Sequence, residues 1–498
     1  MKKRLLIANR SEIAIRIIRA AHKLGIIAVA LKSDKDPDAL YLKYADEIIS
    51  AHDGLNEKPV FLDAPLIVKL AVENNIDMIH PGYGFLSENP EFAELCVANN
   101  LNFVGPSPEL IRNMGLKTIA KDMAIKAGLP LVPGSNGPVK TEADAEINAS
   151  LIGYPVILKA AAGGGGRGMR IVEKPEQLKR NFKSATDEAI SAFGNGDLFI
   201  EKYIQNPKHI EFQILGDKYG NVIHLGEREC SMQRKHQKLI EEAPSASVST
   251  EMRSEMGEMA VRFAKSIGYY SAGTIEFILD EDGKYFFMEM NTRIQVEHPV
   301  TEMVTGVDLV DWQIRISLDE QLTLSQDDIK IEGWAIECRV NTEDVQNRFS
   351  PQTGLIDRIS FPYGDDIRIE SGVENGSIVT PYFDSMIAKI IVKGIDRNDV
   401  IKKTLSTLDN FNIIGLKTTV PFAKAVLKHN DFVNANYTTR WIDQTFNPEL
   451  LEENEEEMIG ALAACIMYAS EYLQLSSDIP AYKPDRLNVW VLNKRLTY

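Results

Sequence analysis

The chain is poor in cysteine, and its few cysteines follow no metal-binding or disulfide pattern. Cys96, Cys230, Cys338 and Cys465 lie far apart among 498 residues, and no two of them form a CxxC pair. Structural zinc sites and the disulfide frameworks of small secreted domains need cysteines at short, regular spacing. We therefore expect neither, and we expect the reducing cytoplasm as the compartment of the protein.

The chain also has no excess of positive charge and no long apolar segment. Its 55 Lys and Arg stand against 71 Asp and Glu, a formal net charge of -16, which disfavours general binding to nucleic acid or anionic membranes. The apolar run near the N-terminus is too short for a signal peptide, and Glu471 and Gln474 interrupt the most apolar later stretch, 458–475. We expect a cytoplasmic protein that binds neither nucleic acid nor a membrane.

Apolar patterning divides the chain into segments of different character. Short apolar and amphipathic runs alternate over residues 5–8, 13–24, 27–31, 78–80 and 90–99. This alternation is typical of the strands and crossover helices of a parallel α/β domain. Strand-like hairpins then dominate to about residue 300, and alternating runs between 333 and 385 predict a third, mixed domain.

A glycine run at 163–168 carries the first functional signal. Gly163, Gly165 and Gly168 match the dinucleotide pattern G-x-G-x-x-G, but that pattern needs a following helix, and residues 169–172 have the pattern of a strand. A glycine hairpin between strands can instead cover phosphates, because backbone N–H groups approach the anion closely. Lys159 favours phosphate binding over a flexible surface loop. Neither a P-loop sequence nor the H-R-D sequence of protein kinases occurs.

Two glutamates on a predicted hairpin form a candidate metal site. If Asp282 and Gly283 are the central residues of a two-residue turn, Glu276 lies directly opposite Glu289. Such side chains are roughly 5 Å apart at Cβ, so the two carboxylates repel unless a cation compensates. Asn291 lies on the same face as Glu289, and oxygen donors of this kind suit Mg²⁺ or Mn²⁺. A register shifted by one residue is the alternative, and it predicts an exposed strand face.

A small-anion site is predicted directly after this hairpin. Arg293, Gln295 and Glu297 occupy alternate positions, so in extended form all three side chains point one way. A guanidinium beside an amide and a carboxylate suits a bidentate grip on a planar anion such as bicarbonate. Glu297 could then remove the proton and activate the anion to attack the γ-phosphate of ATP. A surface ladder of ion pairs is the alternative.

Over nearly all of residues 1–445 the chain resembles the biotin carboxylase family, which are ATP-grasp ligases that carboxylate biotin with ATP and bicarbonate. The resemblance rests on long motifs in the family's order: IANRSEIAIR, HPGYGFLSEN, GPSPELIRNMG, KAAAGGGGRGMR, FIEKYIQNPKHIE, ERECSMQRKHQKLIEEAP, MEMNTRIQVEHPVTE, ECRVNTED and PYFDSMIAKI. It implies a parallel α/β domain at 1–113, an ATP-grasp domain at 114–330 with a lid at about 131–203, and a mixed α+β domain at 331–445. Residues 446–498 form a C-terminal extension.

The resemblance also implies roles for individual residues. ATP would be bound by Lys117, Lys159, Gly163, Gly164, Gly165, Gly166, Gly168, Glu201, Lys202, Tyr203, Ile204, His209, Gln233 and His236. Two ions of Mg²⁺ or Mn²⁺ would be bound by Glu276, Glu289 and Asn291. Bicarbonate would be bound by Lys238, Arg293, Gln295 and Val296, with Glu297 as the base. Arg339 would stabilise the enolate-like ureido oxygen of biotin, in a pocket lined by Tyr83.

Two residues depart from the family's motifs. Ser11 stands where a glycine is expected, and Leu116 stands where the family has an acidic residue. Because serine is a good N-cap, we expect Ser11 to cap the helix that follows it. We expect Leu116 to alter how the neighbouring Lys117 is held.

The partners follow from what the sequence does not contain. It has no A-M-K-M-like lysine for attachment of biotin, and no segment is left for a carboxyltransferase. The chain therefore resembles the separate, homodimeric subunit of a multi-chain carboxylase, with biotin as a substrate on a carrier protein and a carboxyltransferase subunit as partner. An acetyl-CoA carboxylase of fatty acid biosynthesis or a propionyl-CoA carboxylase is favoured over a pyruvate carboxylase. Another ATP-grasp ligase and a non-catalytic subunit of the same fold are the alternatives.

The extension is predicted from its residues alone. An acidic run at 452–457 suits the start of a helix, and apolar residues recur at helical spacing from 458 to 473. Residues 487–492 alternate like a strand. These two elements either pack on the third domain of the same chain or dock the carrier or carboxyltransferase subunit.

Overall fold

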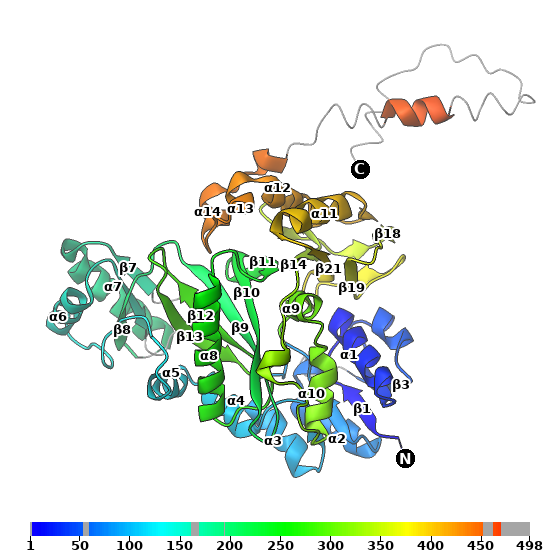
Figure 1. The fold of residues 1–498 in the computed structure, drawn as a ribbon, viewed down its shortest axis with the longest axis horizontal. Helices are drawn as coiled ribbons and strands as arrows, with labels where there is room; N and C mark the ends of the chain where they lie inside the picture. Colours follow the sequence, from blue (N-terminus) through cyan, green and yellow to red (C-terminus); the bar gives the residue numbers. More distant parts are fainter. Residues whose placement is uncertain (1, 53–58, 161–168, 194, 452–461, 470–498) are drawn as a thin grey trace, which may run out of the picture. The chain divides into compact units, whose positions relative to one another are not determined.

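The computed structural model describes residues 2–52, 59–160, 169–193, 195–451 and 462–469. Contacts between Cα atoms divide the chain into two compact units, 1–446 and 447–498. The first unit is a mixed α/β structure with one parallel and one large antiparallel sheet (Figure 1). The predicted fold class is therefore confirmed. The finer domain boundaries of the sequence analysis remain predictions.

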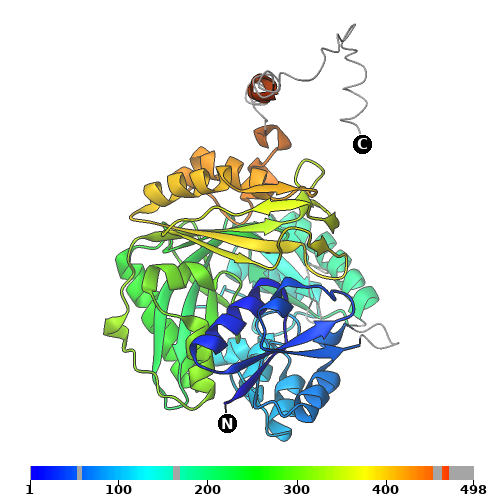
Figure 2. The same cartoon turned by 90° about the vertical axis from the view of Figure 1, so that its right-hand side faces the viewer.

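A parallel sheet opens the chain, drawn in blue in Figure 2. Its strand order is β3-β2-β1-β4-β5. The elements are β1 Arg4–Ile7, α1 Ser11–Lys23, β2 Ile27–Ser33, β3 Glu47–Ala51, α2 Ala64–Glu73, β4 Met78–His80, α3 Pro90–Ala98 and β5 Asn102–Phe103, with 3-10 turns at Leu40–Lys43 and Val60–Leu62. The strand order reverses between β1 and β4, and ligands of such sheets bind beyond the carboxyl ends of the strands at that point.

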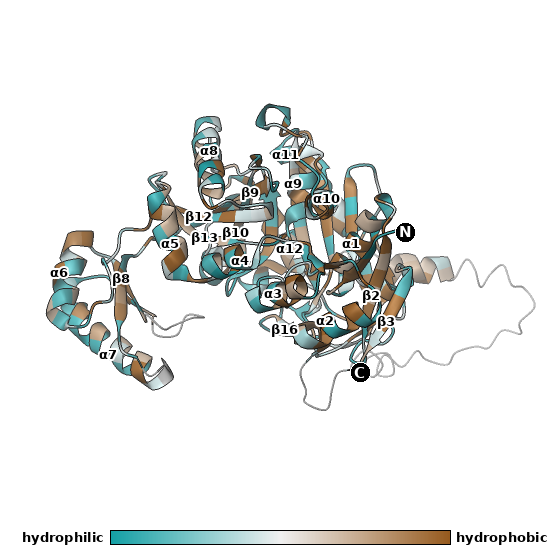
Figure 3. Cartoon of the chain, turned by 90° about the horizontal axis from the view of Figure 1, so that it is seen from below, coloured by the Kyte–Doolittle hydropathy of each residue, from teal (hydrophilic) through white to brown (hydrophobic). Residues whose placement is uncertain are grey.

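A small three-stranded sheet with the order β7-β6-β8 lies in the part of the chain predicted to be the lid. Its strands are β6 Val156–Ala160, β7 Met169–Val172 and β8 Leu198–Lys202, and its helices are α6 Glu142–Ile152 and α7 Pro175–Phe193. In Figure 3 both helices carry apolar and polar residues, as expected for helices with one face on a sheet. Gly163, Gly164, Gly165, Gly166 and Gly168 lie outside the described residues.

An antiparallel sheet of eight strands, β13-β12-β9-β10-β11-β14-β21-β19, carries most of the predicted site. The strands are β9 Lys208–Gly216, β10 Val222–Arg234, β11 Gln237–Ala243, β12 Ser271–Leu279, β13 Tyr285–Asn291, β14 Trp334–Asn341, β19 Ile367–Ser371 and β21 Met386–Gly394. The pairing of β11 with β14 continues the sheet across the expected boundary at 330. Residues that lie far apart in the sequence therefore share one rigid surface.

Helices and short strands surround this sheet. The helices are α4 Pro108–Gly115, α5 Lys117–Lys126, α8 Thr250–Ser266, α9 His298–Thr305, α10 Leu309–Ser317, α11 Arg397–Asp409, α12 Val420–Lys428, α13 Asn430–Val433 and α14 Trp441–Thr445. The short strands are β15 Glu343–Asp344, β16 Ser350–Pro351, β17 Gly354–Leu355, β18 Arg358–Ser360, β20 Ile378–Val379 and β22 Asn412–Ile414, and 3-10 turns lie at Gln326–Asp328 and Pro448–Leu451. The sequence analysis predicted mainly hairpins up to about residue 300 and did not predict the helices α7 and α8.

Of the extension, the structure describes 447–451 and a helix at 462–469. This helix lies within the predicted apolar stripe, and Leu462 and Ile466 are exposed. The acidic run and the strand-like stretch lie outside the described residues. In the part of the chain that the structure describes, no helix is both long and apolar enough to span a membrane.

Candidate active site

The hairpin of β12 and β13 places Glu276 directly opposite Glu289, as predicted. The predicted two-residue turn is wrong, however. Hydrogen bonds between Asp280 and Lys284 close a loop of three residues that ends in Gly283, whose φ is +79°, a geometry that favours glycine. This loop shifts the register by one residue, and a bulge between Glu276 and Phe277 shifts it back. The two errors of the simple pairing rule cancel at the metal candidates.

The two carboxylates have opposite electrostatic surroundings. Burial would raise the pKa of Glu276, but Lys238 and His209 lower it below its usual value. Burial and the charge of Glu276 raise the pKa of Glu289. The amide nitrogen of Asn291 donates to Glu276 Oε1 at 2.9 Å. Glu289 therefore keeps an incompletely compensated negative charge next to two oxygen-bearing side chains, and this donor set fits Mg²⁺ or Mn²⁺.

Lys238 joins three carboxylates at the centre of the site. Its Nζ lies 2.6 Å from Glu211 Oε2 and Glu297 Oε1, and 3.2 Å from Glu276 Oε1. Burial would raise the pKa of Glu297, but Lys238, Arg339 and Arg228 hold it well below its usual range. Glu297 is thus a buried carboxylate that three neighbouring cations hold in its ionised form.

The segment after β13 is not extended, which corrects the sequence-based expectation. Glu297 has φ −81° and ψ 11° and immediately precedes α9. Side chains from the segment still converge, because it turns at this point: Arg293 Nη1 donates to Gln295 Oε1 at 2.8 Å, and Gln295 Nε2 lies 3.5 Å from Glu276 Oε1. Arg293 also donates to Glu88 at 2.9 Å. Arg293 and Gln295 therefore meet as predicted although the local geometry differs, whereas Glu297 pairs with Lys238 and Arg339.

The predicted biotin residues lie on the other side of Glu297. Arg339, on β14, donates to Glu297 Oε2 at 2.9 Å and to Glu241 Oε1 at 2.6 Å. Tyr83 follows β4 at the switch point of the parallel sheet, and its hydroxyl donates to Glu12. Burial and Glu12 raise the pKa of Tyr83, while the nearby charge of Arg339 opposes this. The fold therefore brings Tyr83 and Arg339 to one region.

The predicted ATP residues lie on the lid, on α5 and on the large sheet. Glu201 pairs with Lys159 and with Lys121, whose Nζ is 2.5 Å from Glu201 Oε1. Lys202 donates its amine to the carbonyls of residues 153 and 154, and the Tyr203 hydroxyl accepts from Arg440. Both side chains therefore bind within the protein, and so do the two backbone N–H groups, which donate to the carbonyls of residues 133 and 155. Lys117 begins α5 and is close enough to Glu289 to lower its pKa.

The remaining four predicted ATP residues lie on the large sheet, in a turn of that sheet and after β8. His209 Nε2 lies 3.2 Å from Glu276 Oε2. Gln233 is the last residue but one of β10, and His236 sits in the turn between β10 and β11 with φ +65°. Ile204 follows β8.

The two departures have different structural outcomes. Ser11 does not cap α1, because it is the first residue of the helix, with φ +59°, and Arg10 occupies the cap position. Its Oγ would lie 2.0 Å from a Cβ at Gly372. The left-handed φ explains why a glycine suits this position. Leu116 occupies the N-cap position of α5, and no side-chain hydrogen bond caps that helix.

Sequence reasoning missed several charged residues that complete the site. They are Glu12, Glu88, Lys121, Glu211, Arg228, Glu241 and Lys389. Glu211 could have been found, because it alternates with His209 on β9. All the others except Lys121 lie within the family motifs quoted above, but neither periodicity nor spacing indicates a role for them.

Three family models match the chain. They are the biotin carboxylase N-terminal domain at residues 1–111, the ATP-binding domain of the carbamoyl-phosphate synthase L chain at 117–325, and the biotin carboxylase C-terminal domain at 337–444. Together they span most of the first compact unit.

Biotin carboxylases and subunits of other carboxylases are similar to this chain over most of its length. The 2-oxoglutarate carboxylase small subunit of Hydrogenobacter thermophilus is 49% identical over 94% of this chain and 99% of its own, and the biotin carboxylase of a Nostoc species is 50% identical over 89% and 98%. The methylcrotonoyl-CoA carboxylase subunit alpha of Oryza sativa is 45% identical over 98% of this chain and 67% of its own. A crystal structure of the Hydrogenobacter biotin carboxylase domain dimer, with MgADP, ADP and bicarbonate, is 50% identical over 91% and 99%, with a TM-score of 0.83.

Proposed function

The chain belongs to the biotin carboxylase family of ATP-dependent ligases, and we propose how its residues divide the carboxylation of a carrier-borne biotin. The observation that supports this most is Glu297, an ionised carboxylate held between Lys238 and Arg339. One of these cations belongs to the predicted bicarbonate site and the other to the predicted biotin site. A base shared by two half-sites suits a reaction in which an activated carboxyl group passes from one to the other.

The first step forms carboxyphosphate. Arg293, Gln295 and the Val296 backbone hold bicarbonate, and the Glu297 carboxylate accepts its proton. The freed oxygen attacks the γ-phosphorus of ATP, and the bond from that phosphorus to the bridging oxygen of ADP breaks. Lys238 offsets the negative charge that gathers on the transferring group.

The phosphates are held by the lid, by His209, Gln233 and His236, and by Lys117 and Lys159. Glu276, Glu289 and Asn291 would hold Mg²⁺ or Mn²⁺, which supplies charge neutralisation between the phosphates when bound. The ion pairs of Glu201 with Lys121 and Lys159 place two amines at the root of the lid. The MgADP in the similar Hydrogenobacter structure supports this assignment.

The second step carboxylates biotin. Carboxyphosphate releases its carboxyl carbon to the ureido nitrogen of biotin, the carbon–oxygen bond to phosphate breaks, and phosphate takes the nitrogen's proton. Negative charge develops on the ureido oxygen during this transfer, and Arg339 stabilises it. Tyr83 lines the same pocket.

Arg339→Ala is expected to reduce biotin carboxylation about 100-fold or more and bicarbonate-dependent ATP cleavage without biotin much less, because the guanidinium acts mainly on charge that develops on biotin. Both rates are measured on one preparation, as ADP release with and without free biotin. Arg358→Ala, at an exposed arginine on β18, is the matched control. Parallel losses in the two activities of Arg339→Ala would contradict this placement.

Two alternative functions remain to be tested against this one. Another ATP-grasp ligase, such as a purine-pathway carboxylating enzyme or an amino-acid ligase, would not need both bicarbonate and biotin to cleave ATP, so omitting each compound from the assay separates the two functions. A non-catalytic subunit is disfavoured because each predicted metal and bicarbonate residue is present in the sequence.

The carrier protein and the carboxyltransferase subunit are proposed as separate partners, and a homodimer as the assembly, as the dimer of the similar structure supports. For the final acceptor we propose an acyl-CoA, acetyl-CoA or propionyl-CoA. The alignment with methylcrotonoyl-CoA carboxylase subunit alpha supports this, because it runs through 98% of the chain and so into the extension. The 2-oxoglutarate carboxylase small subunit supports a 2-oxo acid as second candidate. Assaying the co-purified complex with both acceptor classes decides between them.

The extension is proposed to dock a partner subunit. Phe446 packs on Phe349 and Phe422 with ring centroids 5.9 and 5.0 Å apart, so the deletion that tests this begins at residue 447. Removing 447–498 is expected to leave carboxylation of free biotin within about twofold and to abolish co-purification of the partners. Insolubility or a large fall in Tm would show instead that the extension stabilises its own chain.

A further inference from the structure

Lys389 is a buried lysine of β21 that has no role in the two proposed reaction steps. Its side chain is fully buried, and its Nζ lies 2.9 Å from Glu370 Oε2 and 3.4 Å from Glu12 Oε2. Burial would lower the pKa of Lys389, but Glu12 and Glu370 raise it. Lys389 is therefore a charged ammonium in the interior. A buried charge carries a large desolvation cost unless its partners compensate it, so its surroundings are specific.

Its hydrogen bond points into the reacting segment. Lys389 Nζ donates to the carbonyl oxygen of Val296 at 2.8 Å. That carbonyl belongs to the peptide group that links Val296 to Glu297, so the bond fixes the plane from which the Glu297 side chain extends. In the sheet, Lys389 also lies directly opposite Arg339 on β14. Lys389 thus adjoins both the base and the arginine of the biotin site.

The second contact leads to the biotin pocket. Glu12 lies in the first turn of α1, beyond the carboxyl end of β1, and it is buried. One of its oxygens pairs with Lys389, and the other accepts the Tyr83 hydroxyl proton. A single carboxylate therefore separates Lys389 from Tyr83.

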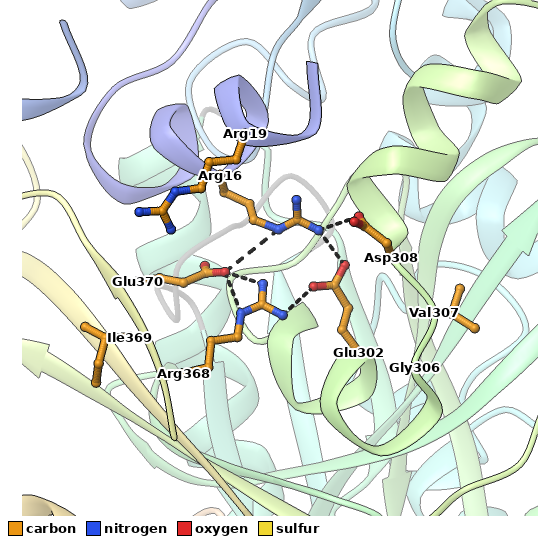
Figure 4. Close-up of a pocket in the computed structure, with 9 residues that line it drawn as sticks. All are labelled: Arg16, Arg19, Glu302, Gly306, Val307, Asp308, Arg368, Ile369 and Glu370. Atoms are coloured by element: carbon orange, nitrogen blue, oxygen red, sulfur yellow. Dashed lines mark hydrogen bonds and ion pairs between the residues drawn. The ribbon is translucent and has the colours of Figure 1, made fainter. Parts of the chain in front are cut away.

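The third contact anchors the lysine from outside the site. Glu370 lies opposite Lys389 on β19, and its other oxygen belongs to a cluster with Arg368 and Arg16 (Figure 4). The same arginines pair with Glu302. This cluster lines a cavity of about 350 Å³. Glu370 is thereby held in place, and the ammonium is fixed relative to the large sheet and to α1.

We propose that Lys389 is a positioning residue of the carboxylation reaction: it holds the Val296–Glu297 peptide for proton transfer and, through Glu12, the Tyr83 hydroxyl of the biotin pocket. The Val296–Glu297 peptide and the Tyr83 hydroxyl come from different parts of the fold, and Lys389 contacts the first directly and the second through Glu12. The inference rests on the proposed function. A purely structural lysine would neutralise the same carboxylates without affecting either half-reaction selectively.

Lys389→Met is the direct test, with Lys393→Met on the same strand as the matched control. A displacement of the base on the order of 1 Å costs about 100-fold in rate. We therefore expect kcat for bicarbonate-dependent ATP cleavage to fall about 100-fold in Lys389→Met, the KM for ATP to change less than about twofold, and Lys393→Met to behave as wild type. A folded Lys389→Met protein with kcat within about twofold of wild type would overturn the proposal.

Glu12→Gln keeps the test decisive if Lys389→Met does not fold. The amide oxygen can accept from Tyr83 or from Lys389 but no longer bridges both as a carboxylate does. We expect the KM for biotin to rise about tenfold while biotin-independent ATP cleavage stays within about twofold. An unchanged KM for biotin would overturn the proposed link from Lys389 through Glu12 to Tyr83. Wild-type protein that lacks bicarbonate-dependent ATP cleavage would instead refute the proposed function, whatever the variants do.

Discussion

Glu297→Gln is expected to lower bicarbonate-dependent ATP cleavage by about 100-fold to 10,000-fold, the range for loss of a general base, with ATP affinity nearly unchanged. The amide cannot accept the proton of bicarbonate. The two cations that contact Glu297 keep other partners, because Lys238 retains Glu211 and Arg339 retains Glu241. The variant should therefore fold, and Tm together with ATP titration checks this.

The control for this variant is Glu332→Gln, at an exposed glutamate before β14, which should match wild type. Equal losses of ATP affinity and turnover in Glu297→Gln would assign Glu297 a structural role. A turnover close to wild type would remove it from the reaction altogether.

Glu289→Gln is expected to lower ATP turnover by about three orders of magnitude, because a lost metal ligand removes several kcal/mol of charge stabilisation. The same substitution is not expected to lower the stability of the metal-free protein. The folded-state pKa of Glu289 is raised by burial and by Glu276, so the charged carboxylate destabilises the fold increasingly as pH rises through that pKa. Removing the charge should leave Tm equal to or above that of wild type at neutral pH, and this difference should vanish in acid.

Glu281→Gln at the exposed tip of the same hairpin is the matched control, and it should change neither turnover nor the pH dependence of Tm. Wild-type turnover in Glu289→Gln would refute the metal assignment. A Tm far below wild type at neutral pH would show that Glu289 stabilises the fold through a contact other than a cation.

Local patterns predicted the elements of the fold and the metal hairpin well. The strands β1, β2 and β4 of the parallel sheet and the strands β6 and β7 of the small sheet follow from runs of apolar residues, which the structure confirms within a few residues. The strands β3, β5 and β8 were missed. The opposition of Glu276 and Glu289 was predicted correctly although the turn was not, because a three-residue loop and a bulge shift the register in opposite senses. Such compensation is invisible in a sequence, where neither shift leaves a signature.

Features that depend on distant segments were beyond a reading of the sequence. The ion pair of Lys389 with Glu12 joins residues separated by most of the first unit, and although each lies in a family motif, neither motif indicates that the two side chains meet. Ser11 shows the other limit. The preference of serine for a cap position is local, but the φ of +59° at Ser11 depends on the path of the backbone from β1 into α1, which passes close to Gly372. Tertiary constraint therefore overrode a local preference there.

Transfer of labelled carbon from bicarbonate to free biotin tests the central claim most directly. Purified protein is incubated with ATP, Mg²⁺, labelled bicarbonate and biotin, and the label on biotin is measured beside the ADP released. We predict label on biotin that requires both ATP and Mg²⁺, with ADP released in at least the same amount. ATP cleavage that does not require bicarbonate, or cleavage that requires it but leaves biotin unlabelled, would contradict the account.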